Sequence, residues 1–266
     1  MITSLSNSRI KDIRKLRTRK EREQTGLSFI EGIRIVADAL QQPETVEMLI
    51  IAPELLSSQF AQNLVQDQRE RGIPCLEVTA EIFQSISQKE GPQGIGAVIH
   101  QHWLSLSRVQ LAEVSFWVAL DSVQDPGNLG SILRTCDAVG CTGAILIGNC
   151  TDPYDPMALR GSMGAVFSLQ LVKTSFQEFV AWKQQHNYSV IGTSDSAPTD
   201  YTATSYKLPT ILLMGSERLG LAQEQQAICD VMVSIPMVGQ SDSLNLSVAT
   251  GIVLYEIFNQ HRAPHK

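Results

Sequence analysis

The chain has 266 residues, of which 43% are hydrophobic and 18% are charged, and its formal net charge is −6. This length suits two modest domains or one large one, and the composition is that of a globular protein. No apolar run approaches the roughly 20 residues of a membrane helix, and no apolar secretory core follows the first residues. We therefore expect a cytoplasmic protein without a membrane partner.

The cysteines give no sign of cross-links. The five residues are Cys75, Cys136, Cys141, Cys150 and Cys229. Their odd number and the absence of a Cys-x-x-Cys pair argue against a disulfide framework and against a zinc site. We expect reduced thiols and no bound metal.

One segment near the N-terminus departs from the acidic average. Residues 9–22 hold eight basic and two acidic residues, so this window carries +6 and the remainder of the chain carries −12. Ile10, Ile13 and Leu16 recur every third position, which predicts a helix that packs by this stripe and turns its charges outward. A solvated helix face is the alternative, but the charge density favours contact with RNA phosphates. The candidate contacts are Arg14, Lys15, Arg17 and Arg19.

Predicted strands and helices then alternate over the first hundred residues. The strands are expected at 27–30, 46–52, 75–78 and 94–99, and the helices at 32–40 and 55–71. This alternation predicts a small α/β domain over residues 1–104, ending near His102. Residues 101–115 are expected to be a linker with a short helix.

Longer apolar strands characterise the second half of the chain. Strands are expected at 116–120, 144–147, 166–172, 188–193, 210–214 and 231–235, and helices at 131–139, 176–185 and 244–259. Continuous apolar strands separated by helices are typical of a parallel sheet covered on both faces. The sequence therefore predicts a second domain over residues 116–266.

The first polar loop of this domain, residues 121–130, contains a Pro126-Gly127 turn. Gly127 and Gly130 would let the backbone approach a partner closely. We expect Arg134 in the first turn of the following helix, beside Asn128. A cation there opposes the helix dipole by about 0.3–1 kcal/mol, so an arginine facing an anion is favoured over a plain surface cation.

Two further loops follow predicted strands, where parallel sheets bind ligands. Gly215-Ser216-Glu217 follows one strand, and Glu217 could cap a helix or pair with an arginine. Residues 239–247 precede the last helix, which Ser243 or Asn245 could cap. The chain lacks Gly-x-Gly-x-x-Gly and a Walker loop, and its histidines lie outside all three loops. A nicotinamide enzyme, an NTPase and a serine hydrolase are therefore poor fits.

Taken together, the three loops resemble the signature motifs of the SpoU (TrmH-like) family of RNA 2′-O-ribose methyltransferases, in the SPOUT superfamily. The motif pieces are Asn-x5-Arg from Asn128, Gly-x-Glu from Gly215 and Ser-Leu-Asn-x-Ser from Ser243. They occur in the family's order over about residues 116–260. Residues 7–22, 29–32 and 91–94 carry a weaker similarity to the family's substrate-binding domain.

The resemblance implies a trefoil-knotted parallel-sheet methyltransferase domain preceded by a small α/β RNA-binding domain. It implies S-adenosylmethionine as cofactor and a homodimer with its active site near the subunit interface. By motif position, the cofactor contacts fall on Gly215, Ile235, Leu244 and, more weakly, Thr193. The family's catalytic arginine corresponds to Arg134, and its supporting polar residues correspond to Asn128, Glu217, Ser243 and Asn245.

The implied reaction is in-line attack of a ribose 2′-oxygen on the cofactor methyl group. An arginine with a pKa above about 12 is a poor proton acceptor, so either Arg134 or a substrate phosphate that it holds would take the proton. Ribosomal RNA is preferred as substrate and transfer RNA remains open. A non-catalytic RNA-binding protein on this fold is the alternative function, and the methylated base is not predicted.

Overall fold

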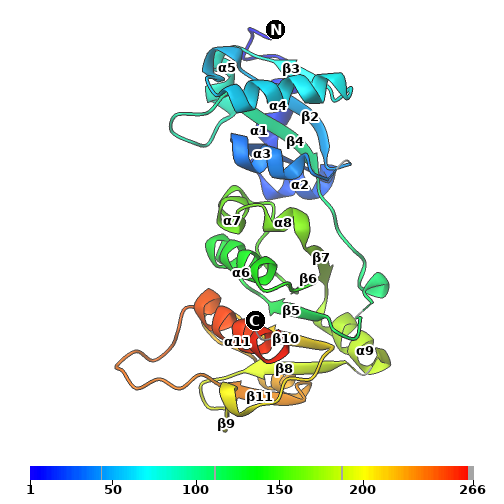
Figure 1. The fold of residues 1–266 in the computed structure, drawn as a ribbon, viewed down its shortest axis with the longest axis vertical. Coiled ribbons are helices and arrows are strands. Elements are labelled where there is room, and N and C mark those ends of the chain that lie inside the picture. Colours follow the sequence, from blue (N-terminus) through cyan, green and yellow to red (C-terminus); the bar gives the residue numbers. More distant parts are fainter. Residues whose placement is uncertain (43, 111, 187, 263–266) are drawn as a thin grey trace. The chain divides into compact units, whose positions relative to one another are not determined.

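The computed structural model describes residues 1–262 except positions 43, 111 and 187 (Figure 1). Position 111 of the predicted linker and positions 263–266 of the predicted second domain lie outside the described residues. The chain divides into two compact units, one of residues 1–102 with 154–156 and one of residues 103–153 with those from 157 onward. The main crossing between units thus falls at His102 to Trp103, whereas the sequence predicts domains over 1–104 and 116–266.

The first unit is a four-stranded sheet with short helices. Its strands are β1 (Leu27–Glu31), β2 (Val46–Ile51), β3 (Cys75–Glu77) and β4 (Ile95–His100), in the order β1-β4-β2-β3. Strand β4 is antiparallel to β1 and β2, and β2 is parallel to β3. Its helices are α1 (Ser8–Lys15), α2 (Arg19–Thr25), α3 (Ile33–Ala39), α4 (Gln59–Glu70) and α5 (Ala80–Ile86), with the 3-10 turn η1 (Pro53–Leu55).

The predicted apolar stripe of the basic segment is buried. Ile10, Ile13 and Leu16 are 0%, 5% and 6% exposed and belong to one core cluster with residues of β2, β4 and α5. Helix α5, which the sequence analysis did not predict, begins after Thr79, whose side chain accepts a hydrogen bond from the Ile82 N–H. The stripe therefore fixes α1 beside α5 on the sheet.

The expectation of one continuous basic helix is wrong. Helix α1 ends at Lys15, and α2 begins at Arg19 because the Thr18 hydroxyl caps it by accepting from the Glu21 N–H at 3.4 Å. Arg22 does not point outward: it is 2% exposed and donates to the carbonyls of Leu16 and Arg17 at 3.0 Å each. This buried arginine satisfies carbonyls at the end of α1.

The second unit is built on a seven-stranded sheet of order β7-β6-β5-β10-β8-β11-β9, in which every pair is parallel. The strands are β5 (Phe116–Asp121), β6 (Gly143–Ile147), β7 (Gln170–Thr174), β8 (Ser189–Thr193), β9 (Thr199–Asp200), β10 (Thr210–Met214) and β11 (Val231–Ser234). The helices are α6 (Pro126–Ala138), α7 (Pro156–Ser162), α8 (Ala165–Ser168), α9 (Phe176–His186), α10 (Gln223–Ala227) and α11 (Leu246–His261), with 3-10 turns η2 (Leu106–Arg108) and η3 (Tyr201–Ala203).

Both faces of this sheet are covered, as the apolar strands predict. All six residues of β5 are buried. Phe179 and Trp182 of α9 share a core cluster with Trp117 and Ala119 of β5. Helix α11 packs against α6 and β10, as Figure 1 also shows (red and green helices). The parallel-sheet domain expected after the small α/β domain is thus confirmed.

Two element predictions in this unit are wrong. Residues 166–172 are not one strand, because α8 occupies Ala165–Ser168 before β7 starts at Gln170. Helix α6 starts at Pro126 instead of residue 131, since Asp125 caps it and proline is well suited to the first helical position. Among the described residues, no helix is long and apolar enough to cross a membrane.

Candidate functional site

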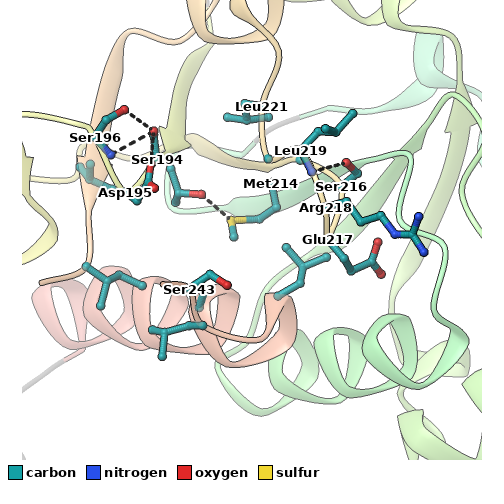
Figure 2. Close-up of a pocket in the computed structure, with 18 of the residues that line it drawn as sticks. Ser194, Asp195, Ser196, Met214, Ser216, Glu217, Arg218, Leu219, Leu221 and Ser243 are labelled. Carbon is teal, nitrogen blue, oxygen red and sulfur yellow. Dashed lines mark hydrogen bonds between the residues drawn. The ribbon is translucent and has the colours of Figure 1, made fainter. Parts of the chain in front are cut away.

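A cavity of about 460 Å³ lies at the carboxyl ends of the central strands of the second unit (Figure 2). It is lined by residues that follow β8, β10 and β11 and by the start of α11. All four predicted cofactor contacts line it, namely Thr193, Gly215, Ile235 and Leu244. This is the place where open parallel sheets bind ligands, and the volume falls in the range of small-molecule sites.

The loop after β10 needs glycine at its base. A Cβ atom on Gly215 would overlap the backbone of Gly220, with which the neighbouring Ser216 forms an antiparallel bridge. The Gly220 N–H donates to the Ser216 carbonyl at 3.0 Å, and the Leu219 N–H donates to the Ser216 hydroxyl at 3.3 Å. The loop is therefore a closed, tight turn beside the cavity.

The structure joins the three sequence motifs by direct hydrogen bonds. Asn245 Nδ2 donates to Asn128 Oδ1 at 2.9 Å, and Asn128 Nδ2 donates to Glu217 Oε1 at 3.3 Å. The Glu217 carboxylate also accepts the N–H groups of Gln124 at 3.2 Å and Asp125 at 3.1 Å. Residues from three separate parts of the sequence thus form one polar cluster.

Glu217 is stabilised as an anion in this cluster. Burial by itself raises the pKa of the carboxyl group, but hydrogen bonds from its own N–H, from Asp125 and Gln124 and from the Asn128 amide outweigh it and lower the pKa below 4.5. Of the two sequence-based readings of Glu217, the structure supports neither a helix cap nor a pair with an arginine. The carboxylate instead ties the β10 loop to the loop before α6.

Asn245 has two roles in the structure. Its Oδ1 accepts the N–H groups of Ser247 at 2.9 Å and Val248 at 3.4 Å, so it caps α11, which was the plain alternative for this residue. Its Nδ2 is left to bond Asn128. Ser243 does not cap the helix; it is exposed and lines the cavity. Figure 2 shows it on the loop that leads into α11.

Arg134 differs most from expectation. Because α6 begins at Pro126, Arg134 lies in the second half of that helix and not in its first turn, so the argument from the helix dipole was wrong. Its side chain is exposed, makes no hydrogen bond or ion pair within the described residues, and does not line the cavity of its own chain. The hydrogen bonds that Glu217 and Asn128 make within the described residues go to other residues.

Gly130 of the first loop serves a purpose other than the expected one. A Cβ on Gly130 would overlap the Ala158 carbonyl and come within 3.0 Å of the Gly161 Cα, both on α7. Gly130 therefore lets two helices approach closely and does not face a ligand. Among the cavity-lining residues that the sequence did not single out are Ser194, Asp195 and Ser196, although they directly follow the predicted strand end at Thr193.

The predicted RNA contacts all lie on the first unit, and all four have partners. Arg14 donates to the Leu5 carbonyl at 3.1 Å and the Ser85 hydroxyl at 2.6 Å, and Arg17 donates to the carbonyls of Ser85 and Ser87. These two residues attach α1 to the end of α5.

Lys15 and Arg19 instead form ion pairs with residues one helical turn away, Asp12 at 2.8 Å and Glu23 at 3.0 Å. Three other basic residues of the segment, Arg9, Lys11 and Lys20, are exposed and make no hydrogen bond or ion pair with the described part of the chain. The acidic partners of Lys15 and Arg19 lie at i,i+3 and i,i+4 spacing in the sequence. This spacing would have distinguished the paired cations from those without a partner.

Among the described residues, neither the thiols nor the possible metal ligands form a second catalytic or metal centre. The described cysteines form no disulfide, and burial raises the pKa of Cys150 to about 11 and that of Cys229 to about 12. No three His, Cys, Asp or Glu side chains within the described ranges are grouped to hold a metal ion.

Comparison with known proteins agrees with both units. Residues 115–255 match the SpoU rRNA Methylase family, and residues 7–97 match the MRM3-like substrate binding domain. The chain is 30% identical to the 23S rRNA (guanosine(2553)-2'-O)-methyltransferase RlmP of Bacillus subtilis, over 96% of this chain and 98% of that protein. It is 31% identical to a 23S rRNA (uridine(2479)-2'-O)-methyltransferase of Streptomyces viridochromogenes, over 92% and 87%.

A solved structure has the same fold over nearly the whole chain. It is an AdoMet-bound rRNA methyltransferase from Sinorhizobium meliloti, with 35% identity and a TM-score of 0.89 over 98% of both chains. The family match covers more than half of this chain and contains all three joined motifs. The chain belongs to the SpoU rRNA methylase family.

Proposed function

We propose that this protein transfers the methyl group of S-adenosylmethionine to a ribose 2′-oxygen of ribosomal RNA. The observation that carries the proposal is the junction of Asn128, Glu217 and Asn245 beside the cavity that Gly215 and Leu244 line. Two relatives, 30% and 31% identical to this chain, are named for a guanosine and for a uridine, so membership favours the ribose reaction and leaves the base open. Transfer RNA stays the alternative substrate, and the cytoplasm is the proposed location.

The lining of the cavity suits S-adenosylmethionine. Val233, Ile235, Leu244 and Leu246 provide apolar surface for an adenine ring, while Gly215 leaves its backbone close to the cavity. The turn Ser194 to Ser196 adds hydroxyl and carboxylate groups on the side of the cavity away from Glu217 and Arg218 (Figure 2). When bound, the cofactor supplies an electrophilic methyl group. We assign its contacts to Thr193, Gly215, Ile235 and Leu244.

The polar residues position the ribose. In our proposal, Ser243 and the amide of Asn245 shape the ribose pocket, and Asn128 and Glu217 hold that wall in place through their hydrogen bonds. Such positioning brings reacting atoms to about 3–3.5 Å, which is worth several orders of magnitude in rate. As the new O–C bond forms, the bond from the methyl carbon to the cofactor sulfur would break, and the 2′-hydroxyl proton must pass to a base.

We propose that Arg134 assists the removal of this proton. A guanidinium has a pKa above about 12 and is a poor acceptor, so we assign it to holding an RNA phosphate whose oxygen takes the proton. Arg134 has no internal partner among the described residues, so its guanidinium is available to an anion. The observation that it does not line its own chain's cavity supports a site completed by a second copy.

A homodimer is therefore part of the proposal. Helices α6 and α11 border a shallow groove lined by Ser131, Thr135, Ser247, Val248, Gly251, Ile252 and Tyr255. Val248 and Tyr255, seven positions apart and therefore on one face of α11, are 49% and 47% exposed. A second copy on this groove would cover them and would bring its own Arg134, which lies on α6.

The proposed RNA surface of the first unit is revised by the structure. Arg9, Lys11 and Lys20 are the exposed cations without internal partners, and the exposed ion pairs of Lys15 and Arg19 are worth at most about 1 kcal/mol each. All five can turn to phosphates. Arg14 and Arg17, proposed as contacts from the sequence, are assigned mainly to holding α1 in place.

The experiment is methyl transfer from labelled S-adenosylmethionine to total RNA from cells that lack this protein, followed by nucleoside analysis. A labelled 2′-O-methyl nucleoside supports the proposal and names the base. The Arg134→Ala variant should lose transfer yet keep the rise in melting temperature that S-adenosylmethionine gives by mass action. Cofactor binding without transfer to any RNA fraction would favour a non-catalytic RNA-binding protein.

A further inference from the structure

The tip of the loop after β10 presents an arginine and a leucine to solvent. Leu219 is 87% exposed, although it lines the cavity. Arg218 is also exposed and has no hydrogen bond or ion pair with the described residues. It is the one cation among the described residues that line the cavity.

This exposure is built into the loop. The turn is closed at its base by the Ser216–Gly220 bridge and by the contact that requires glycine at position 215. Leu221, directly after the turn, is 5% exposed and belongs to the core cluster under α9. With both ends of the loop fixed, Arg218 and Leu219 cannot withdraw into the fold.

Further apolar groups surround the same opening. Met237 and Leu244, 38% and 37% exposed, line the cavity, and Val238 beside Met237 is fully exposed. The opening thus combines apolar surface with a single available cation. A nucleotide has the matching chemistry, since it carries an anionic phosphate and an apolar base face.

The carboxylate that precedes Arg218 in the chain does not pair with its guanidinium. Glu217 precedes Arg218 in the chain, but its oxygens accept hydrogen bonds from Gln124, Asp125 and Asn128, and no ion pair joins it to Arg218. Figure 2 shows the charged ends of both residues turned away from the Ser194 to Ser196 side of the cavity. The guanidinium is therefore left to an external anion.

We infer that Arg218 and Leu219 hold the RNA nucleotide next to the methylated one, with Arg218 on a backbone phosphate and Leu219 against the base. This inference rests on the proposed function, because it takes RNA as the molecule brought to the cofactor cavity. It makes the pair substrate-positioning residues of the second unit. The basic surface of the first unit is then not the sole source of RNA affinity.

The test uses the full-length protein and an unmodified 23S ribosomal RNA transcript as probe. Arg218→Ala should raise the KM for RNA roughly tenfold, leave the kcat and the affinity for S-adenosylmethionine unchanged, and flatten the salt dependence of binding by the roughly 0.7 expected of one phosphate contact. Arg218→Lys should restore the salt slope. Leu219→Ala should raise the KM without changing that slope.

Arg108→Ala serves as the matched control. Arg108 is also exposed but lies on η2, which packs against α9 and β7, and it does not line the cavity. An Arg218→Ala protein with the KM and salt slope of the Arg108→Ala protein overturns the inference, even when wild-type protein methylates RNA. Absence of methyl transfer by the wild type would count against the proposed function, and the equilibrium salt slopes would still decide whether Arg218 contacts RNA. Loss of S-adenosylmethionine binding in Arg218→Ala would also overturn the inference, since it would make Arg218 a cofactor residue.

Discussion

Asn245 donates a hydrogen bond to Asn128 at 2.9 Å although 117 positions separate them in the sequence. The bond connects the cap of α11 to the first turn of α6, and Asn128 passes the connection on to Glu217. The side-chain amides of Asn128 and Asn245 thus hold together α6 and α11, which border the groove, and the loop after β10, which lines the cavity. We therefore expect a substitution in one motif to disturb the positions of the other two.

The first prediction concerns this bond. Asn128→Ala removes its links to both Asn245 and Glu217, and we expect roughly a 10²-fold loss of kcat with the fold retained. In a double-mutant cycle with Asn245→Ala, the effects on unfolding free energy should be non-additive by about 1 kcal/mol, as for one net hydrogen bond. Urea unfolding of the four proteins measures it. Strict additivity would mean that the bond contributes nothing to the stability of the folded protein.

The second prediction follows from the lowered pKa of Glu217. A carboxyl group whose pKa is lower in the folded than in the unfolded protein stabilises the fold above its unfolded value of 4.5, and this contribution is lost as the pH falls through the folded value. Glu217→Gln should therefore be less stable than wild type at about pH 6, and the gap should narrow toward about pH 3. Melting temperatures of both proteins across this range test the sign. A gap that widens on acidification would show that the carboxylate is destabilising.

Apolar runs in the sequence predicted the strand ends better than the contacts between the loops at those ends. Thr193, Gly215, Ile235 and Leu244 line one cavity because each ends or follows a strand of the parallel sheet or lies just before the last helix, and strand ends can be located from apolar runs. The bonds that join Asn128 to Glu217 and Asn245 depend on which strands are neighbours. The order β5-β10-β8-β11 is not encoded in any local pattern.

The errors have local physical causes. The predicted start of α6 is too late because Pro126, Gly127 and Gly130 are typical of turns. Proline is, however, favoured at a helix start, and Gly130 is needed for close contact with α7. The predicted basic helix continues past Thr18, but in the structure the Thr18 side chain caps α2, which competes with a continuous helix. Burial of Arg22 could not be read from its neighbours, all of them polar or charged.

The third prediction separates the two groups of cations in the basic segment. Arg9→Ala, Lys11→Ala and Lys20→Ala together remove three exposed charges without internal partners, so the log–log salt slope of RNA binding should fall by about 2, with an unchanged melting temperature. Arg14→Ala with Arg17→Ala should instead destabilise the protein by about 1–3 kcal/mol, because both hold α1 to the end of α5. Salt titrations of RNA binding and thermal unfolding of both variants distinguish them. The reverse pattern would return the RNA contacts to Arg14 and Arg17.

The last prediction tests the groove between α6 and α11 as the dimer interface. Val248 is 49% exposed there, and a buried aspartate in its place would bring an unpaired charge into the contact. Val248→Asp should therefore shift the mass in solution from dimer to monomer and remove methyl transfer, since Arg134 does not line the cavity of its own chain. Phe60→Asp is the matched control, because Phe60 is a 60% exposed apolar residue on α4 of the other unit. Light scattering reports the mass. A Val248→Asp protein that is monomeric and fully active would place Arg134 in the site of its own chain, and a wild-type monomer would remove the second copy from the mechanism.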